Sequence, residues 1–173
     1  MKKEIFELSN ELGKALLAKK ATVTTAESCT GGGVANAITA VSGSSQWFHS
    51  AYVTYANNAK HDMLGISKAL LLDQGAVSEA VVTEMVKAAA QAAKADYAVA
   101  ISGIAGPSGG SPGKPVGTVW FGILGPQGIR CFKYQFVGDR EAVREQSVQI
   151  SLKELLHQVA ECTTVHPYSN YSF

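Results

Sequence analysis

Residues 25–33, with the sequence TAESCTGGG, bring together a serine, a cysteine and three consecutive glycines. A glycine inside a helix costs about 1 kcal/mol relative to alanine, so a run of three indicates that a ligand approaches the backbone closely. Free N–H groups at the start of a helix also stabilise an anion or an oxyanion. The segment therefore fits a nucleophilic Ser28, but it fits equally well a helix that Ser28 or Thr30 caps after a tight turn.

A serine nucleophile needs a base, and His49, Lys60 and His61 are the candidates that follow it. Neither histidine lies in a motif with an orienting carboxylate, so both are better explained as exposed or simply hydrogen-bonded. Lys60 can act only if burial or a neighbouring cation lowers its pKa, and by spacing alone it is a surface lysine. Tyr55 and Lys60 flank a predicted strand-to-helix junction, so both could reach one pocket. Cys29 has no cationic partner nearby in sequence, which favours an inert buried thiol.

A second glycine cluster, residues 102–118, holds six glycines and three prolines in 17 residues. Its spacing matches neither the phosphate loop GxxxxGK[ST] nor the dinucleotide fingerprint GxGxxG. Successive backbone N–H groups in such a loop can still form an anion-binding nest. The alternative is a mobile loop without function, although loops of this length are uncommon unless they are functional or disordered.

The third candidate segment is GDREAVR, residues 138–144, which opens a predicted helix. Asp139 is a good N-cap, and Arg140 and Arg144 lie four residues apart on one helix face. Two arginines near a helix N-terminus suit a phosphate, because a guanidinium binds phosphate with two parallel hydrogen bonds. Two solvated arginines paired with Glu141 or Glu145 explain the pattern equally well.

The hydrophobic periodicity predicts the elements that must position these segments. The expected strands are 21–26, 47–56, 96–106, 115–125 and 128–138. The expected helices are 5–19, 32–41, 57–65, 68–75, 79–95 (with Ser78 as N-cap) and 139–160. Strands that alternate with helices indicate a three-layer α/β/α sandwich, and the late hairpin around residues 125–128 makes its sheet mixed and mostly parallel.

Composition bounds the protein class. The 173 residues are 46% hydrophobic and 17% charged, which suits one globular domain, expected over residues 1–162, with an unassigned tail at 163–173. Fifteen basic against 14 acidic residues argue against nucleic acid or an anionic membrane as partner. Three separated cysteines favour neither disulfides nor zinc. With no signal-peptide core or transmembrane stretch in the sequence, we expect a cytoplasmic protein.

Together these residues carry a family resemblance. Six blocks occur in the order found in the CinA C-terminal domain family: TVTTAESCTGG, WFHSAYVTYANNAK, GAVSE, DYAVAISGIAGPSGG, KPVGTVWFG and GDREAVR. The chain resembles that family over residues 5–160, and AESCTGG together with SGIAGP is highly specific. Members that stand alone are nicotinamide-nucleotide amidases, so the resemblance implies hydrolysis of nicotinamide mononucleotide to nicotinate mononucleotide and ammonia, in pyridine nucleotide recycling.

The resemblance also implies roles for individual residues. Ser28 would be the nucleophile, Lys60 its base and Tyr55 an assisting group, while N–H groups near Thr30 and Gly31 would hold the oxyanion. The residues expected to bind the substrate are Thr30, Gly31, Gly32, Asn57, Gly103, Ala105, Gly106, Ser108, Gly109, Thr118 and Arg140.

Within that set, the loop 102–110 and Arg140 would hold the phosphate, with Arg144 a weaker candidate. Asn57 and Thr118 would shape the nicotinamide-ribose pocket. We expect no cofactor and no metal, a small-molecule nucleotide as substrate, and a homo-oligomer. The alternative is a non-catalytic nucleotide-binding or sensor module of the same family, which could dispense with Ser28 and Lys60. A Tyr/Lys dehydrogenase is disfavoured, because such enzymes space the pair as Tyr-x3-Lys.

Overall fold

A computed structural model describes residues 2–161 of the chain. Five strands form one sheet in the order β2-β1-β3-β4-β5. Their bounds are β1 (Val23–Glu27), β2 (Phe48–Val53), β3 (Tyr97–Gly103), β4 (Thr118–Gly125) and β5 (Gly128–Gln135). β1 pairs in parallel with β2 and β3, whereas β4 is antiparallel to both β3 and β5. Only β4 therefore runs against the other strands, which confirms the mixed, mostly parallel sheet.

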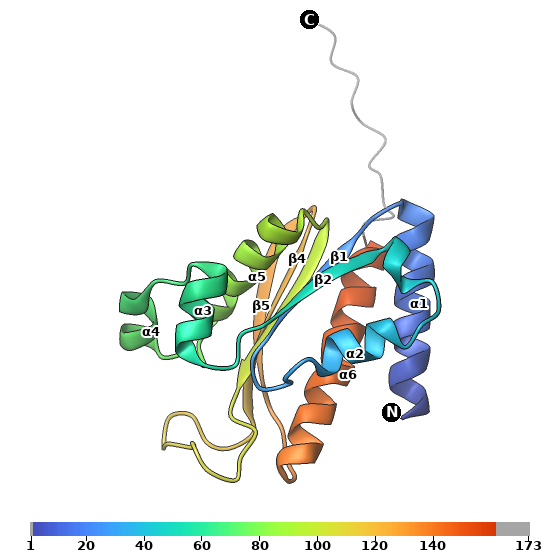
Figure 1. Ribbon diagram of the computed structural model, residues 1–173. Coiled ribbons are helices and arrows are strands. Elements are labelled where there is room, and N and C mark those ends of the chain that lie inside the picture. The colour runs from blue at the N-terminus through green and yellow to red at the C-terminus, as the bar shows by residue number, and fades with distance from the viewer. Residues whose placement is uncertain (1, 162–173) are drawn as a thin grey trace, which may run out of the picture.

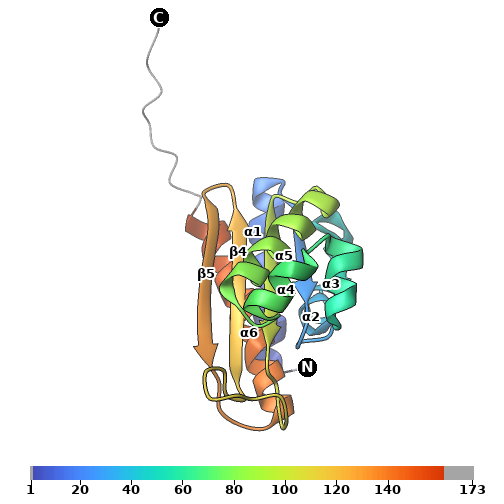
Figure 2. The same ribbon diagram turned by 90° about the vertical axis from the view of Figure 1, so that its left-hand side faces the viewer.

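Helices cover both faces of this sheet (Figures 1 and 2). One face is covered by α1 (Lys3–Lys19), α2 (Gly33–Thr39) and α6 (Arg140–Glu161). The opposite face is covered by α3 (Asn57–Leu64), α4 (Lys68–Gln74) and α5 (Glu79–Ala93), and a short 3-10 turn, η1 (Ser44–Gln46), precedes β2. The three-layer α/β/α sandwich is therefore confirmed.

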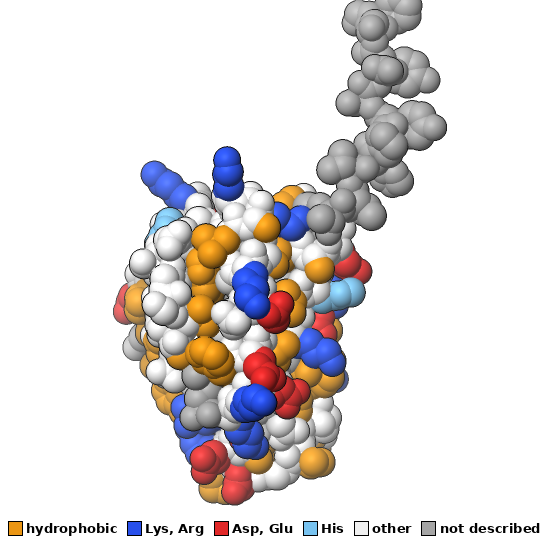
Figure 3. All heavy atoms as spheres, turned by 90° about the vertical axis from the view of Figure 1, so that its right-hand side faces the viewer, with side chains coloured by type: hydrophobic (Ala, Val, Ile, Leu, Met, Phe, Trp, Pro, Cys, Tyr) orange, Lys and Arg blue, Asp and Glu red, His pale blue; other side chains and the backbone are white. Residues whose placement is uncertain are grey.

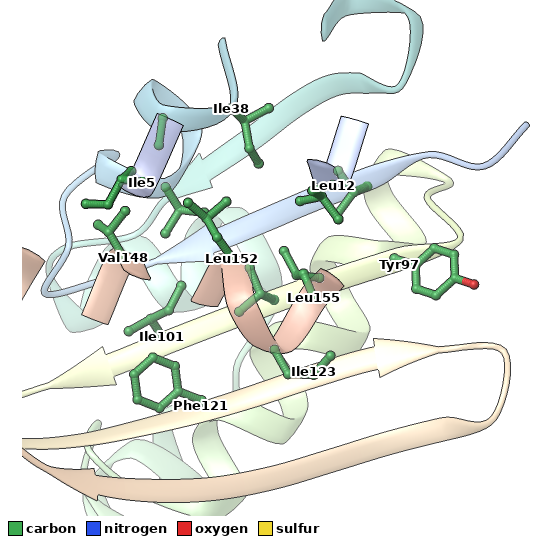
Figure 4. Close-up of a cluster of buried hydrophobic side chains, with 14 of the residues drawn as sticks. Ile5, Leu12, Ile38, Tyr97, Ile101, Phe121, Ile123, Val148, Leu152 and Leu155 are labelled. Atoms are coloured by element: carbon green, nitrogen blue, oxygen red, sulfur yellow. The ribbon is translucent and has the colours of Figure 1, made fainter. Parts of the chain in front are cut away.

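The core consists of two apolar layers separated by the sheet. Figure 4 shows the layer beneath α1 and α6, where Leu12, Leu152 and Leu155 pack near Ile101 and Ile123 of the sheet. Side chains of β3 alternate between the two layers, as its near-continuous apolar sequence predicts for a strand covered on both faces.

Capping residues begin two helices where the sequence predicts. Ser78 Oγ accepts from the Val81 N–H at 3.4 Å at the start of α5, and Asp139 Oδ1 accepts from the Ala142 N–H at 2.9 Å at the start of α6. The predicted strand 115–125 begins only at residue 118, because Gly117 has a φ of +91° that takes the backbone out of the ladder. The predicted strand 47–56 stops at residue 53, and the carbonyls of the two residues after it accept from a buried lysine.

The arrangement gathers the candidate segments at one edge of the sheet. The carboxyl ends of β1, β2 and β3 meet there, together with the start of β4 and the start of α6, at the lower end of Figure 1. This is the edge at which open α/β sheets bind ligands.

The face seen in Figure 3 intersperses positive and negative side chains and carries no continuous positive patch. No helix within residues 2–161 is long and apolar enough to cross a membrane. Cys162 and the predicted tail at 163–173 lie outside the described residues.

Candidate active site

Ser28 and Lys60 meet in the interior of this edge. Ser28 follows β1 and is 8% exposed, and its Oγ lies 3.0 Å from Nζ of Lys60, which is 1% exposed on the inner face of α3. The same Nζ donates to the Thr54 carbonyl at 2.8 Å and, at 3.4 Å, to the Tyr55 carbonyl. β2 ends at residue 53, and the carbonyls of the next two residues accept from the lysine.

Burial sets the protonation of this pair. It lowers the pKa of Lys60 from 10.5 to about 8, so a useful fraction of the amine is neutral near neutral pH and can accept a proton. Burial also raises the pKa of the neighbouring Cys29 thiol to about 12, so Cys29 stays protonated. Ser28 is therefore the better nucleophile, as its pairing with a neutral amine also indicates.

Neither candidate histidine hydrogen-bonds Ser28 or Lys60 in the described structure. His61 Nδ1 lies 3.0 Å from the Ile66 carbonyl, and His49 is exposed on β2. Within residues 2–161, Lys60 is the one titratable side chain that hydrogen-bonds Ser28 Oγ. Lys60 is thus not the surface lysine that its spacing alone suggests.

Glu27 shapes the turn around the serine and is absent from the sequence-based site. Its fully buried carboxylate accepts from the N–H groups of Gly32 at 3.1 Å, Val34 at 3.1 Å and Ala35 at 2.9 Å, and from the Thr25 hydroxyl at 3.2 Å. These are the otherwise unpaired N–H groups of the first turn of α2. A carboxylate six residues before the helix therefore does the capping.

That cap excludes the alternative in which Ser28 or Thr30 caps the helix. Ser28 Oγ pairs with Lys60, and Thr30 Oγ1 is buried with no hydrogen-bond partner among the described residues. Gly31 and Gly32 have φ values of +60° and +91°, which explains why glycines are needed here.

The turn leaves two N–H groups free to bind a ligand. The Gly31 N–H donates to the Ser28 carbonyl at 3.0 Å and the Gly32 N–H donates to Glu27, so both are committed to the protein. Within the described chain, no backbone carbonyl accepts from the N–H groups of Cys29 and Thr30. The geometry therefore favours Cys29 and Thr30, and not Gly31, as oxyanion donors.

The two arginines at the start of α6 contact different segments of the chain. Arg144 donates to the carbonyls of Cys29 at 3.1 Å and Thr30 at 3.0 Å, so it holds the nucleophile turn in place. Arg140 donates to the Gly106 carbonyl at 2.9 Å and to the Tyr55 hydroxyl at 2.6 Å. The Tyr55 side chain is 57% exposed and lies on Arg140, while only its carbonyl reaches Lys60.

Packing accounts for part of the second glycine cluster. A Cβ on Gly103 would lie 2.6 Å from Val119 Cγ2, and one on Gly106 would lie 2.6 Å from Val116 Cγ1. Gly106 also has a φ of +84°. These glycines are required by the folded loop itself, whatever it binds.

The same loop nevertheless offers donors. Among the residues described, the N–H groups of Ala105, Gly106, Ser108 and Gly109 have no acceptor, and Ala105 and Gly106 are buried. Buried N–H groups are rarely left unpaired, so the loop is suited to an anion beside Arg140.

The two residues predicted to shape the nicotinamide-ribose pocket, Asn57 and Thr118, line two separate hollows. Asn57 lines a hollow of about 180 Å³ at the outer side of α3 and α4. The Thr118 hydroxyl donates to the Pro115 carbonyl at 2.7 Å and to Gln135 Oε1 at 2.8 Å. Thr118 also borders a hollow of about 870 Å³ between α5 and the last two strands. Neither side chain hydrogen-bonds Ser28 or Lys60 in the described structure.

No three His, Cys, Asp or Glu side chains within residues 2–161 are grouped to hold a metal ion.

Comparison with known sequences places the chain among relatives. The sequence profile described as CinA C-terminal domain matches residues 5–159. The nicotinamide-nucleotide amidohydrolase PncC of Enterobacter agglomerans is 56% identical over 157 residues, which cover 90% of this chain and 96% of that protein. The protein of the same name from Escherichia coli K12 is 53% identical over 161 residues, which cover 92% of this chain and 98% of that protein.

Solved structures of CinA-related proteins match the fold of this chain. A CinA superfamily protein from Klebsiella pneumoniae matches with a TM-score of 0.87 at 39% identity, covering 91% of this chain and 98% of its own. The competence/damage inducible protein CihA from Agrobacterium tumefaciens matches with a TM-score of 0.89 at 36% identity, covering 91% and 97%. Sequence, fold and site geometry thus lead to one assignment, and the chain belongs to the CinA C-terminal domain family.

Proposed function

We propose that the chain hydrolyses the carboxamide of nicotinamide mononucleotide to nicotinate mononucleotide and ammonia, through an acyl-enzyme at Ser28. The observation that carries the proposal is the 3.0 Å contact between Ser28 Oγ and the buried Lys60 Nζ. The names of two relatives that align over most of the chain support the substrate. The reaction would serve pyridine nucleotide recycling, and the predicted cytoplasmic location and homo-oligomer stay predictions.

The first step is formation of the acyl-enzyme. Neutral Lys60 accepts the hydroxyl proton of Ser28 while Ser28 Oγ attacks the carboxamide carbon. The carboxamide oxygen gains negative charge, which the free N–H groups of Cys29 and Thr30 stabilise. Protonated Lys60 then gives its proton to the nitrogen, the C–N bond breaks, and ammonia leaves.

The second step regenerates the serine. Lys60, neutral again, accepts a proton from water as the water oxygen attacks the acyl carbon. The ester bond breaks, Lys60 returns the proton to Ser28 Oγ, and nicotinate mononucleotide departs. In this proposal Lys60 carries the proton in both steps, because its Nζ is the titratable group that contacts Ser28 Oγ.

The remaining groups bind the nucleotide. The loop N–H groups of Ala105, Gly106, Ser108 and Gly109 face the phosphate, and Arg140 exchanges its contact with Tyr55 for a phosphate oxygen. This division leaves Arg144 on the carbonyls of the nucleophile turn, where it already makes two hydrogen bonds.

Ammonia release from nicotinamide mononucleotide tests the proposal. Wild type should release ammonia, and Ser28→Ala should reduce the rate to near background while the nucleotide still binds. Ser44→Ala is the matched control, because Ser44 is also 8% exposed but lies in η1. No ammonia from wild type, with nucleotide binding retained, would contradict the amidase and favour the sensor module. Full activity in Ser28→Ala would reject the nucleophile.

A further inference from the structure

Ser28 lies in a row of three hydroxyl residues at the edge of the sheet. The Thr54 N–H donates to the Glu27 carbonyl and the Ser28 N–H donates to the Ile101 carbonyl, both at 2.9 Å. In a parallel ladder these bonds place Ser28 opposite Thr54 on one side and opposite Ser102 on the other.

The alternation of side chains sets the face on which Ser102 lies. Ala26 of β1 and Ala100 of β3 both point into the layer beneath α5. Two residues further along β3, Ser102 occupies that same face, and Ser28, directly after β1, reaches it through its contact with Lys60. Lys60 approaches Ser28 from this face as well, because α3 packs against α5.

Ser102 is one of three buried hydroxyl residues near the site whose hydroxyl has no partner in the described structure. It is 1% exposed, and its Oγ has no hydrogen-bond partner among the described residues. A buried polar group without a partner requires an explanation, since most such groups in folded proteins are paired. The Thr54 hydroxyl is unpartnered too, but Lys60 Nζ occupies the Thr54 side of the serine at 2.8 Å from its carbonyl. Ser28 is therefore flanked by the Lys60 amine on the Thr54 side and by the unpartnered Ser102 hydroxyl on the other.

The geometry points to Ser102 as the acceptor of a hydrogen bond from the NH2 group of the bound carboxamide, and so as a residue that determines specificity for amides. The inference rests on the proposed function. The carbon under attack must come within about 3–3.5 Å of Ser28 Oγ. Its nitrogen is about 1.33 Å further, and neighbouring strands are about 4.8 Å apart, so the nitrogen comes within reach of a hydroxyl on β3.

Two other directions around the carboxamide carbon already have protein groups in the proposed mechanism. In the proposed mechanism, the carboxamide oxygen accepts hydrogen bonds from the N–H groups of Cys29 and Thr30. The Lys60 amine lies on the side of Thr54. A hydroxyl that accepts from one N–H bond also turns the nitrogen lone pair toward the protonated Lys60. An ester has no N–H to offer, so its cleavage should not depend on Ser102.

Ser102→Ala tests this with two substrates, nicotinamide mononucleotide and the methyl ester of nicotinate mononucleotide. For the amide, kcat/KM should fall about tenfold or more, the effect of one lost hydrogen bond. For the ester it should stay within about twofold, and the thermal midpoint should be equal or higher because an unpaired buried hydroxyl is removed. Ser102→Thr should restore the amide-to-ester ratio.

Ser151→Ala is the control, since it removes a buried hydroxyl that is bonded to the Ser147 carbonyl inside α6. It should leave the amide-to-ester ratio unchanged. An unchanged amide rate in Ser102→Ala, or an equal loss on both substrates, would overturn the inference while leaving the amidase intact. If wild type cleaves neither substrate, the proposed function fails and this inference fails with it.

Discussion

The two ends of the site are built differently. At the reacting end, Ser28, Lys60 and Glu27 are buried, and every one of these side chains is hydrogen-bonded to protein. At the end proposed to bind the phosphate, Tyr55 is 57% exposed and the Arg140 guanidinium makes its contacts near solvent. The difference teaches that folding alone pairs Ser28 with Lys60, whereas the proposed anion-binding loop keeps N–H groups for which no backbone carbonyl within residues 2–161 is an acceptor.

Each construction suits its task. A lysine becomes a base only where water is excluded, because burial is what lowers its pKa. A phosphate must enter and leave, so its donors are held by contacts that exchange readily, such as the one between Arg140 and the Tyr55 hydroxyl. Disrupting the buried end should therefore abolish turnover, and disrupting the exposed end should weaken binding.

Lys60→Met should have the largest effect. Methionine fills the same buried volume without an amine, so kcat should fall about 10³-fold, within the range for loss of a general base, while the protein stays folded. Steady-state kinetics measures kcat, and circular dichroism shows whether the variant is folded. Lys68→Met, on the exposed start of α4, is the control and should behave as wild type. A wild-type kcat in Lys60→Met would reject the base.

Arg140→Ala should have the next largest effect, and it should weaken substrate binding. Loss of a charge-assisted hydrogen bond should raise KM about 10- to 100-fold with kcat nearly unchanged. Arg130→Ala is the control, because Arg130 lies on β5 and pairs with Glu154. A fall in kcat at constant KM would contradict the separation of the two ends.

The pH dependence should separate the two ends without any mutation. Lys60 must be neutral to act, so the rate should rise with pH through its pKa of about 8 and should be about tenfold higher at pH 9 than at pH 7. KM should stay nearly constant over that range, because a phosphate is already almost fully ionised there and arginine keeps its charge. Stopped assays of ammonia at saturating substrate measure the profile. A rate that is flat or falls with pH would contradict the lysine base.

Tyr55→Phe should have the smallest effect. The change removes an exposed hydroxyl that accepts from Arg140, so KM should change by about two- to fivefold and kcat by less than about twofold. A fall in kcat of tenfold or more would instead return Tyr55 to the reacting end, as an assisting group.

The fold was predictable because its signals are local. The apolar run of β3 indicates a strand covered on both faces, and Ser78 and Asp139 cap the helices that the sequence assigns to them. The ends of the strands were harder to predict, because strand pairing stops where residues far apart in the sequence make other contacts. Lys60 is the example, since its amine binds the carbonyls of Thr54 and Tyr55 directly after the end of β2.

The site was predictable only in part, because burial and register are tertiary properties. The local sequence around Lys60 is polar, and only the packing of α3 against α5 shows that its amine is buried. Arg140 and Arg144 are equivalent by spacing, yet they contact different loops. Glu27 sits five loop residues away from the helix that it caps, and no capping pattern covers that distance. Ser102 becomes noticeable only through the register of β1 and β3.

Trapping the acyl-enzyme tests the central claim most directly. Wild type should be mixed with nicotinamide mononucleotide at a pH below 8, where hydrolysis of the ester is slow, then quenched in acid and examined by mass spectrometry of the intact protein and its peptides. The account predicts a nicotinate mononucleotide acyl group on Ser28, formed together with one equivalent of ammonia, and none in Ser28→Ala. An acyl group on Cys29, or turnover in wild type with no acyl group under any quench, would contradict it.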